Sequence, residues 1–81
     1  MKFKILLFAS LQDEWQSPSI EVELAEQATA QDLLDAVKIL RPDLSDRLSH
    51  VRVANGEEFC SPTSVLDSSQ EIALIPPVSG G

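Results

Sequence analysis

The sequence has few of the residues that usually build metal and redox sites. Its 81 residues include one cysteine, one histidine, three glycines and no tyrosine. A single cysteine cannot form an internal disulfide, which fits a reducing compartment, and we therefore expect a cytoplasmic protein. One histidine and one cysteine cannot assemble the usual nitrogen and sulfur ligands of zinc, so we expect no metal site and no bound cofactor.

Basic side chains and long apolar runs are also scarce. Six lysines and arginines stand against 13 acidic residues, which gives a formal charge of −7 and a pI of about 4.4. This balance argues against a nucleic-acid partner, because phosphate binding needs basic groups, and it favours a partner with a basic face. The longest run without a charged or turn residue, residues 5–9, is far shorter than the roughly 20 residues of a membrane span. We therefore expect no membrane partner.

A catalytic constellation is missing as well. No cysteine, histidine and acidic residue lie at a spacing that suggests nucleophilic catalysis. A chain of this length allows one domain and buries only about 60% of its unfolded surface, which leaves little volume for an enclosed active site. The sequence therefore favours a function carried by the surface or by a terminus.

The hydropathy pattern of the first half predicts two strands and one helix. Residues 2–8 begin with strict alternation and become apolar on both sides, whereas residues 19–24 alternate like a half-buried strand. The residues between them are expected to form a loop that could include one short helical turn. Thr29 can cap a helix with Asp32 in its first turn, and Pro42 ends that helix near Leu40.

The second half predicts three more strands, over residues 50–54, 57–60 and 71–75. Asn55-Gly56 tolerates the positive φ of a type I′ turn. The first and last strands are the most apolar, so both belong at the centre of the sheet, parallel to one another if adjacent. One helix across this mixed sheet gives an α+β, β-grasp domain over residues 1–75.

The last six residues, 76–81, form a predicted extended tail of sequence Pro-Pro-Val-Ser-Gly-Gly. A double proline favours the extended polyproline conformation, and two terminal glycines are slim enough to thread a narrow channel. The α-carboxylate of Gly81 is an anion at neutral pH and a poor electrophile, so it needs activation, for example as an acyl-adenylate made by a separate ATP-dependent enzyme. The activated carbonyl could then accept an amine or sulfur, and the residues do not decide between them.

The chain resembles the small, sulfur-carrier subunits of molybdopterin synthase, a ubiquitin-related family. Residues 66–81, with their Pro-Pro-Val-Ser-Gly-Gly ending, carry the most specific part of the resemblance; residues 4–11 and the helix led by Thr29 add to it. The resemblance implies a β-grasp fold and a Gly81 that an E1-like enzyme adenylates with ATP. A sulfur-donating enzyme would then convert Gly81 to a thiocarboxylate.

The same resemblance implies a larger assembly. The tail residues Pro76, Pro77, Val78, Ser79 and Gly80 would insert into the active site of a large catalytic subunit. There the thiocarboxylate would give sulfur to cyclic pyranopterin monophosphate, so this chain would be a non-catalytic subunit of a heterotetramer. Catalytic groups would come from the large subunit.

Apolar side chains at the root of the tail form a candidate interface. Leu6 and Phe8 point away from the core-facing residues of their strand, and Ile75 shares their face if the last strand is adjacent. Such a patch is either a docking surface for the large subunit or a face that the domain's own loops cover. The lone Cys60 is read as a small hydrophobic residue rather than as a persulfide relay.

Three other functions stay open at this point. The chain could carry sulfur for thiamine synthesis or tRNA thiolation, although the Pro-Pro-Val ending argues against both. It could be a ubiquitin-like modifier that forms isopeptide bonds with other proteins. It could also be a non-catalytic interaction domain with an incidental Gly-Gly end, and only this last function would survive removal of Gly81.

Overall fold

The computed structural model describes residues 1–77 as five strands and three α-helices, with one short 3-10 helix between the second and third of them. In chain order the elements are β1 (Lys2–Leu7), α1 (Ser10–Trp15), β2 (Ser19–Glu23), α2 (Ala30–Leu40), η1 (Pro42–Leu44), α3 (Ser45–Leu48), β3 (Arg52–Asn55), β4 (Glu58–Phe59) and β5 (Ile72–Ile75). No helix within residues 1–77 is both long enough and apolar enough to cross a bilayer.

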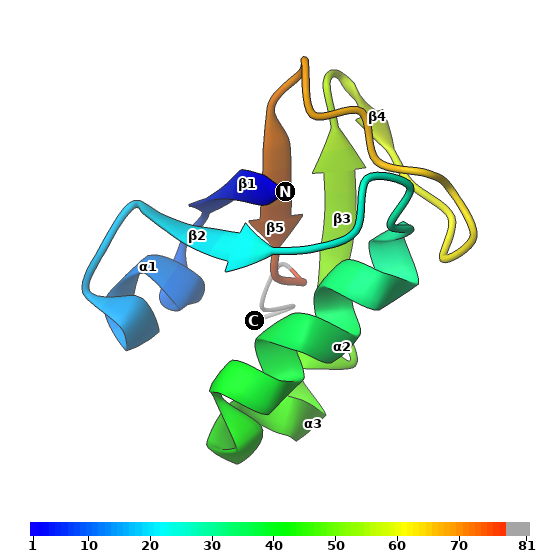
Figure 1. Cartoon of the computed structure of the whole chain (residues 1–81). Helices are drawn as coiled ribbons and strands as arrows, with labels where there is room; N and C mark the ends of the chain where they lie inside the picture. The colour runs from blue at the N-terminus through cyan, green and yellow to red at the C-terminus, as the bar shows by residue number, and fades with distance from the viewer. Residues whose placement is uncertain (78–81) are drawn as a thin grey trace.

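The strands form one mixed sheet in the order β2-β1-β5-β3-β4. β1 and β5 run parallel at its centre, with Leu6 opposite Ala73, while the other neighbouring strands are antiparallel. α2 lies across one face of this sheet, and α1 fills the connection between β1 and β2 (Figure 1). The β-grasp arrangement and the central, parallel placement of the first and last strands are therefore confirmed.

α2 begins and ends where its sequence predicts. The backbone N–H of Asp32 donates to the Thr29 hydroxyl oxygen at 3.2 Å, and the N–H of Thr29 donates to the Asp32 carboxylate at 3.0 Å. This reciprocal capping box satisfies two amides that have no partner inside the helix. Arg41, just before Pro42, has a non-helical backbone with φ −133° and ψ 75°, so the helix ends at Leu40.

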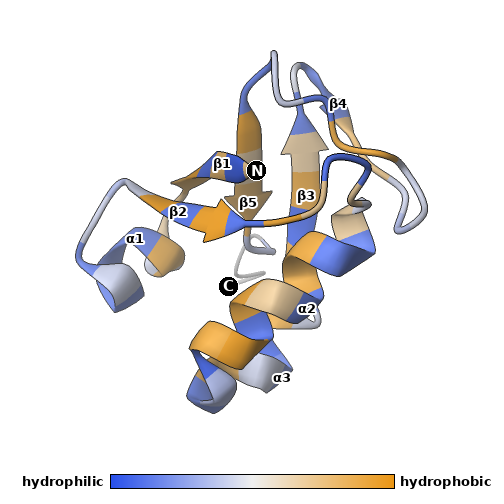
Figure 2. Ribbon diagram, viewed as in Figure 1, coloured by the Kyte–Doolittle hydropathy of each residue, from blue (hydrophilic) through white to orange (hydrophobic). Residues whose placement is uncertain are grey.

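The core lies between α2 and one face of the sheet, where hydrophobic residues gather along β1, β5 and the inner side of α2 (Figure 2). Alternate residues of β1 and β5 point into it, as the period of two along a strand requires. Its largest fully buried side chains are Phe3, Ile5, Leu7, Leu11, Leu33, Val37, Leu48, Ile72 and Leu74. The opposite face of the sheet, which we call the outer face, has no helix packed on it in the described chain.

The helical turn that the sequence allows after β1 is longer than expected, because residues 10–15 form a six-residue helix. So short a helix is not stable alone, and its stability comes from tertiary contacts. The side chain of Leu11 is buried in the core. Gln16 ends the helix in the left-handed region at φ 53°.

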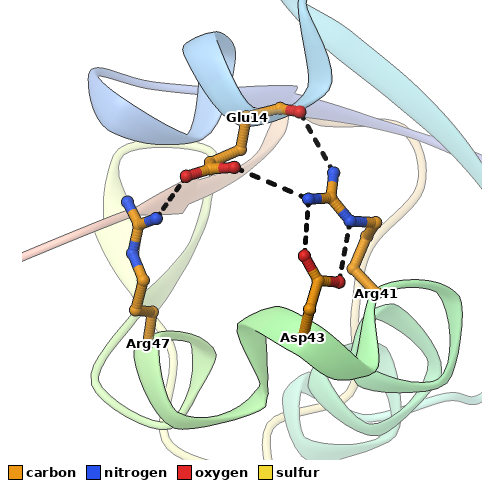
Figure 3. A network of polar contacts seen from close by, with 4 residues as sticks. All are labelled: Glu14, Arg41, Asp43 and Arg47. Atoms are coloured by element: carbon orange, nitrogen blue, oxygen red, sulfur yellow. Dashed lines mark hydrogen bonds and ion pairs between the residues drawn. The ribbon is translucent and has the colours of Figure 1, made fainter.

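A polar network on the surface ties α1 to the end of α2 and to α3 (Figure 3). Arg41 donates to the Glu14 carbonyl oxygen at 3.0 Å and forms a two-pronged pair with Asp43 at 3.0 and 2.9 Å. Arg47 forms an ion pair with the same Glu14. The hydrogen bonds from Arg41 lower the pKa of Asp43, and those to Asp43 raise the pKa of Arg41. Because four charges share one network, it fixes α1 more firmly than isolated surface pairs would.

The β3–β4 turn also differs from its prediction. Asn55 pairs with Glu58 across the hairpin, so Gly56 and Glu57 are its two central residues. Only Gly56 has a positive φ, of 67°, whereas a type I′ turn needs a positive φ at both positions. The Asn55 amide explains the shift, because it bonds to the carbonyl oxygen of Asp67 at 3.1 Å and accepts the Asp67 N–H at 2.7 Å.

Candidate functional site: the root of the tail and the outer face

The tail starts from the centre of the sheet. β5 ends at Ile75, between β1 and β3, and Pro76 and Pro77 follow it. Neither proline has a backbone N–H, so the strand pairing cannot continue. The remaining predicted tail residues, Val78, Ser79, Gly80 and Gly81, lie outside the described residues. The candidate site in the described chain is therefore the surface around the tail root.

One side of the tail root borders a small groove. Pro76 and Pro77 line a hollow of about 190 Å³ together with Leu11 of α1 and Val51 just before β3. Leu11 and Val51 are otherwise buried, so the prolines stand against the edge of the core. This contact connects the start of the tail to the body of the domain.

The other side of the tail root is the outer face, where apolar side chains form a row across four strands. Leu6 of β1 lies opposite Ala73 of β5, Ala73 lies opposite Ala54 of β3, and Ala54 lies opposite Phe59 of β4. Residues directly opposite one another share a face of the sheet, so these four side chains form a continuous row from strand to strand across it.

Ile75 and Phe8 extend this row toward the tail. Ile75 lies two residues beyond Ala73 on the same face of β5. Phe8 directly follows β1, and continuing the alternation of that strand assigns it to the side of Leu6. We call the set of Leu6, Phe8, Ala54, Phe59, Ala73 and Ile75 the outer patch. Phe8 is 45% exposed and Phe59 is 54% exposed, whereas Leu6 and Ile75 are half-buried.

The domain's own loops border the outer patch without closing it. Leu6 lines a hollow of about 260 Å³ with Lys4 and residues 68–71, the loop before β5. Ile75 lines another hollow, of about 180 Å³, with Ala54 and Phe59. The sequence left open whether this face is covered by the domain's own loops or is a docking surface. A loop flanks Leu6, as the first interpretation expects, while two phenylalanine rings remain open to solvent, as a docking surface requires.

Comparison with known proteins places the chain in a family. The sequence profile of the ThiS family matches residues 5–81. The chain belongs to the ThiS family. A molybdopterin synthase sulfur carrier subunit from Arabidopsis thaliana is 31% identical over 81 residues, covering 100% of this chain and 84% of the relative. One from Dictyostelium discoideum is 36% identical, covering 99% and 96%. The predicted resemblance is therefore confirmed.

A solved structure of a second kind of relative is also similar. The crystal structure of SAMP1 from Haloferax volcanii superimposes with a TM-score of 0.80 at 30% identity, and the alignment covers 100% of both chains. This likeness extends over the whole described domain and supports the ubiquitin-like β-grasp fold. The ThiS-family chain thus resembles both sulfur carrier subunits and a small archaeal modifier.

Cys60 of this ThiS-family chain is a free cysteine that packs, partly buried, against the hydrophobic core. Burial raises the pKa of its thiol, and the negative charge of Glu58 raises it further. The thiol is therefore protonated at neutral pH and a weak nucleophile, which fits a small hydrophobic residue better than a sulfur relay. Within residues 1–77, no three histidine, cysteine or acidic side chains gather where they could hold a metal ion.

The sequence analysis named Leu6, Phe8 and Ile75 of the outer patch but did not place Ala54 or Phe59 on this face. Residues 57–60 were expected to form a short return strand, but the pairing of Phe59 with Ala54 decides which face its ring occupies. The register of a two-residue strand is set by its turn, so the sequence held only a weak signal. Arg52, whose guanidinium lies over the Phe59 ring, was missed for the same reason.

Proposed function

We propose that this chain is the sulfur carrier subunit of a molybdopterin synthase. Gly81 is adenylated by an E1-like enzyme, converted to a thiocarboxylate, and donates its sulfur to cyclic pyranopterin monophosphate in the active site of a large catalytic subunit. The observation that carries the proposal is the Gly-Gly tail that follows the central strand of a ThiS-family domain. Similarity over the whole chain to subunits with that name supports the choice of pathway.

The chemistry divides between this chain and its partners. The Gly81 carboxylate attacks the α-phosphorus of ATP on the activating enzyme, and pyrophosphate leaves. Sulfur at the sulfide level, delivered by a sulfur-donating enzyme, then attacks the acyl carbonyl carbon. The bond from that carbon to the adenylate oxygen breaks, AMP leaves, and Gly81 carries a thiocarboxylate. This chain supplies the slim tail and the surface that presents it, while the acids, bases and substrate pocket belong to the partners.

The outer patch gives the large subunit a surface to bind. Phe8 and Phe59 expose aromatic area, and aromatic side chains are enriched among the residues that dominate binding energy. Because Ile75 belongs to the patch and immediately precedes Pro76, docking there fixes where the tail starts. A partner seated on this face would therefore receive the tail in a defined direction.

A protein modifier is the second candidate, and the similarity to a small archaeal modifier favours it. The two functions share the adenylation of Gly81 and differ in what attacks the activated carbonyl. Sulfur gives a carrier, whereas the amine of a lysine gives an isopeptide-linked conjugate.

Intact mass spectrometry separates these functions. The chain is incubated with ATP, a sulfur donor and the E1-like enzyme of the same organism, with a variant lacking Gly81 as the control. We expect one oxygen of Gly81 to be replaced by sulfur in the complete chain and no change in the control. A mass increase equal to another protein would favour the modifier, and an unchanged mass with an active enzyme would contradict both.

A further inference from the structure

Arg52 is a positively charged residue within the mostly apolar outer face. It lies opposite Ile75 in the β3–β5 pairing, in the row next to the tail root, and its side chain is exposed. Its guanidinium carbon lies 4.2 Å from the centre of the Phe59 ring. This cation–π contact holds the charge beside the exposed rings of the outer patch.

The other two arginines of the chain are already engaged by acidic groups. Arg41 pairs with Asp43 and Glu14, and Arg47 pairs with Glu14. Arg52 makes no ion pair and no hydrogen bond with an acidic side chain among residues 1–77, although the chain carries 13 acidic residues. Its donors therefore face solvent rather than a partner within the described domain.

A partner that covers the outer patch would remove Arg52 from water. An arginine buried without a counter-charge is strongly unfavourable, whereas a carboxylate that meets both of its N–H donors compensates for the lost hydration. The Phe59 ring already restricts the side chain, so little further conformational entropy is lost when the pair forms. The arrangement thus suits a partner with an acidic side chain at this one point.

We propose that Arg52 fixes the orientation of docking by pairing with a carboxylate on the large subunit, next to the entrance for the tail. This inference rests on the proposed function, because it takes the large subunit as the occupant of the outer patch. A partner with a generally basic face attracts this acidic chain from a distance. One carboxylate at a defined position then selects the docking orientation in which Pro76 meets the entrance for the tail on the large subunit.

The test measures the affinity of the complete chain for the large subunit of the same organism by isothermal titration calorimetry. Arg52→Gln removes the charge, Arg52→Lys keeps the charge without the planar fork, and Lys38→Gln on α2 removes an equal charge from the other side of the sheet. We expect Arg52→Gln to weaken binding about ten-fold or more, Arg52→Lys to lie between it and the wild type, and Lys38→Gln to bind like the wild type. The loss should change little as salt concentration rises, because a pair buried under the partner is screened much less than one exposed to water.

A double-mutant cycle identifies the carboxylate. Acidic residues on the large subunit are changed one at a time to lysine and combined with Arg52→Glu, and one swap should restore binding. Equal binding by the wild type and Arg52→Gln, with matching melting temperatures, would overturn the inference while leaving the proposed function intact. Failure of the wild type itself to bind the large subunit, or to gain sulfur at Gly81, would overturn the proposed function and this inference with it.

Discussion

Phe8 provides the most direct test of the outer patch as a docking surface. Its ring is 45% exposed in the free chain, so a partner seated on the patch can bury it, whereas folding alone does not. We therefore expect Phe8→Ala to weaken binding to the large subunit with little change in the melting temperature. A core substitution such as Phe3→Ala would instead destabilise the fold by about 3–5 kcal/mol, because Phe3 is 2% exposed.

The expected size of the effect follows from the exposed area of the ring. A phenylalanine side chain offers about 150–250 Å² for burial, so 45% exposure leaves roughly 90 Å² for a partner to cover. At about 25 cal/mol per Å² this area contributes about 2 kcal/mol to binding. The loss corresponds to about a 30-fold increase in Kd, as an upper value, since alanine retains the Cβ atom.

Ile39→Ala is the matched control for this measurement. Ile39 is 78% exposed on α2, on the side of the sheet opposite the outer patch, so it offers more exposed surface than Phe8 but in the wrong place. Calorimetric titration of both variants against the large subunit decides the question. Phe8→Ala binding within two-fold of a wild type that binds well, or an equal loss for Ile39→Ala, would refute the assignment of this face.

Three further predictions concern the surroundings of the site. Ala9 has φ 51° and ψ −126°, a backbone region that suits glycine. Ala9→Gly should therefore raise the free energy of unfolding, measured in urea, by about 1 kcal/mol, and a lower value than in the wild type would show that the strain is absent. Gly56→Ala should destabilise the fold by about 1–2 kcal/mol, because φ at Gly56 is +67° and a Cβ there would lie 2.0 Å from the Gln70 side-chain oxygen. Adding Gln70→Ala removes the close contact but not the positive φ, so it should recover only part of the loss in melting temperature. Hydrogen bonds from Ser69 lower the pKa of Asp67, so its contribution to stability is present at neutral pH and is lost as the pH falls below about 4. Asp67→Asn should therefore lose less stability than the wild type between about pH 6 and about pH 3, and identical losses would contradict this cause.

The helix and the central strands could be predicted because each has a local physical cause. Thr29 and Asp32 form the start of α2 from four consecutive residues, and Pro42 limits its end by a clash with the residue before it. The apolar character of β1 and β5 placed both strands at the centre, since strands that are apolar on both faces are typical of the covered middle of a sheet. The Gly-Gly end and the double proline indicated the family, because these features are local in sequence.

The sequence alone did not predict the length of α1 or the form of the β3–β4 turn. α1 is held by the burial of Leu11 and by the contacts of Glu14 with Arg41 and Arg47, which lie far along the chain, and no local signal shows such contacts. The turn depends on Asn55 bonding to Asp67, which shifts the positive φ to Gly56 alone. In each case a tertiary contact outweighs a weak local preference.

The sequence by itself determined the fold class, the family and the chemistry available at the tail, because periodicity, capping and terminal residues are properties of neighbours in the chain. Only the tertiary structure decided which side chains surround the tail root. Strand register brings Leu6, Ala73, Ala54 and Phe59 into one row and sets Arg52 against the Phe59 ring. Register depends on pairing between segments as far as 67 residues apart in the sequence, as β1 and β5 are. In so short a strand as β4 the local sequence barely resists a one-residue slip, and such a slip would move Phe59 to the other face.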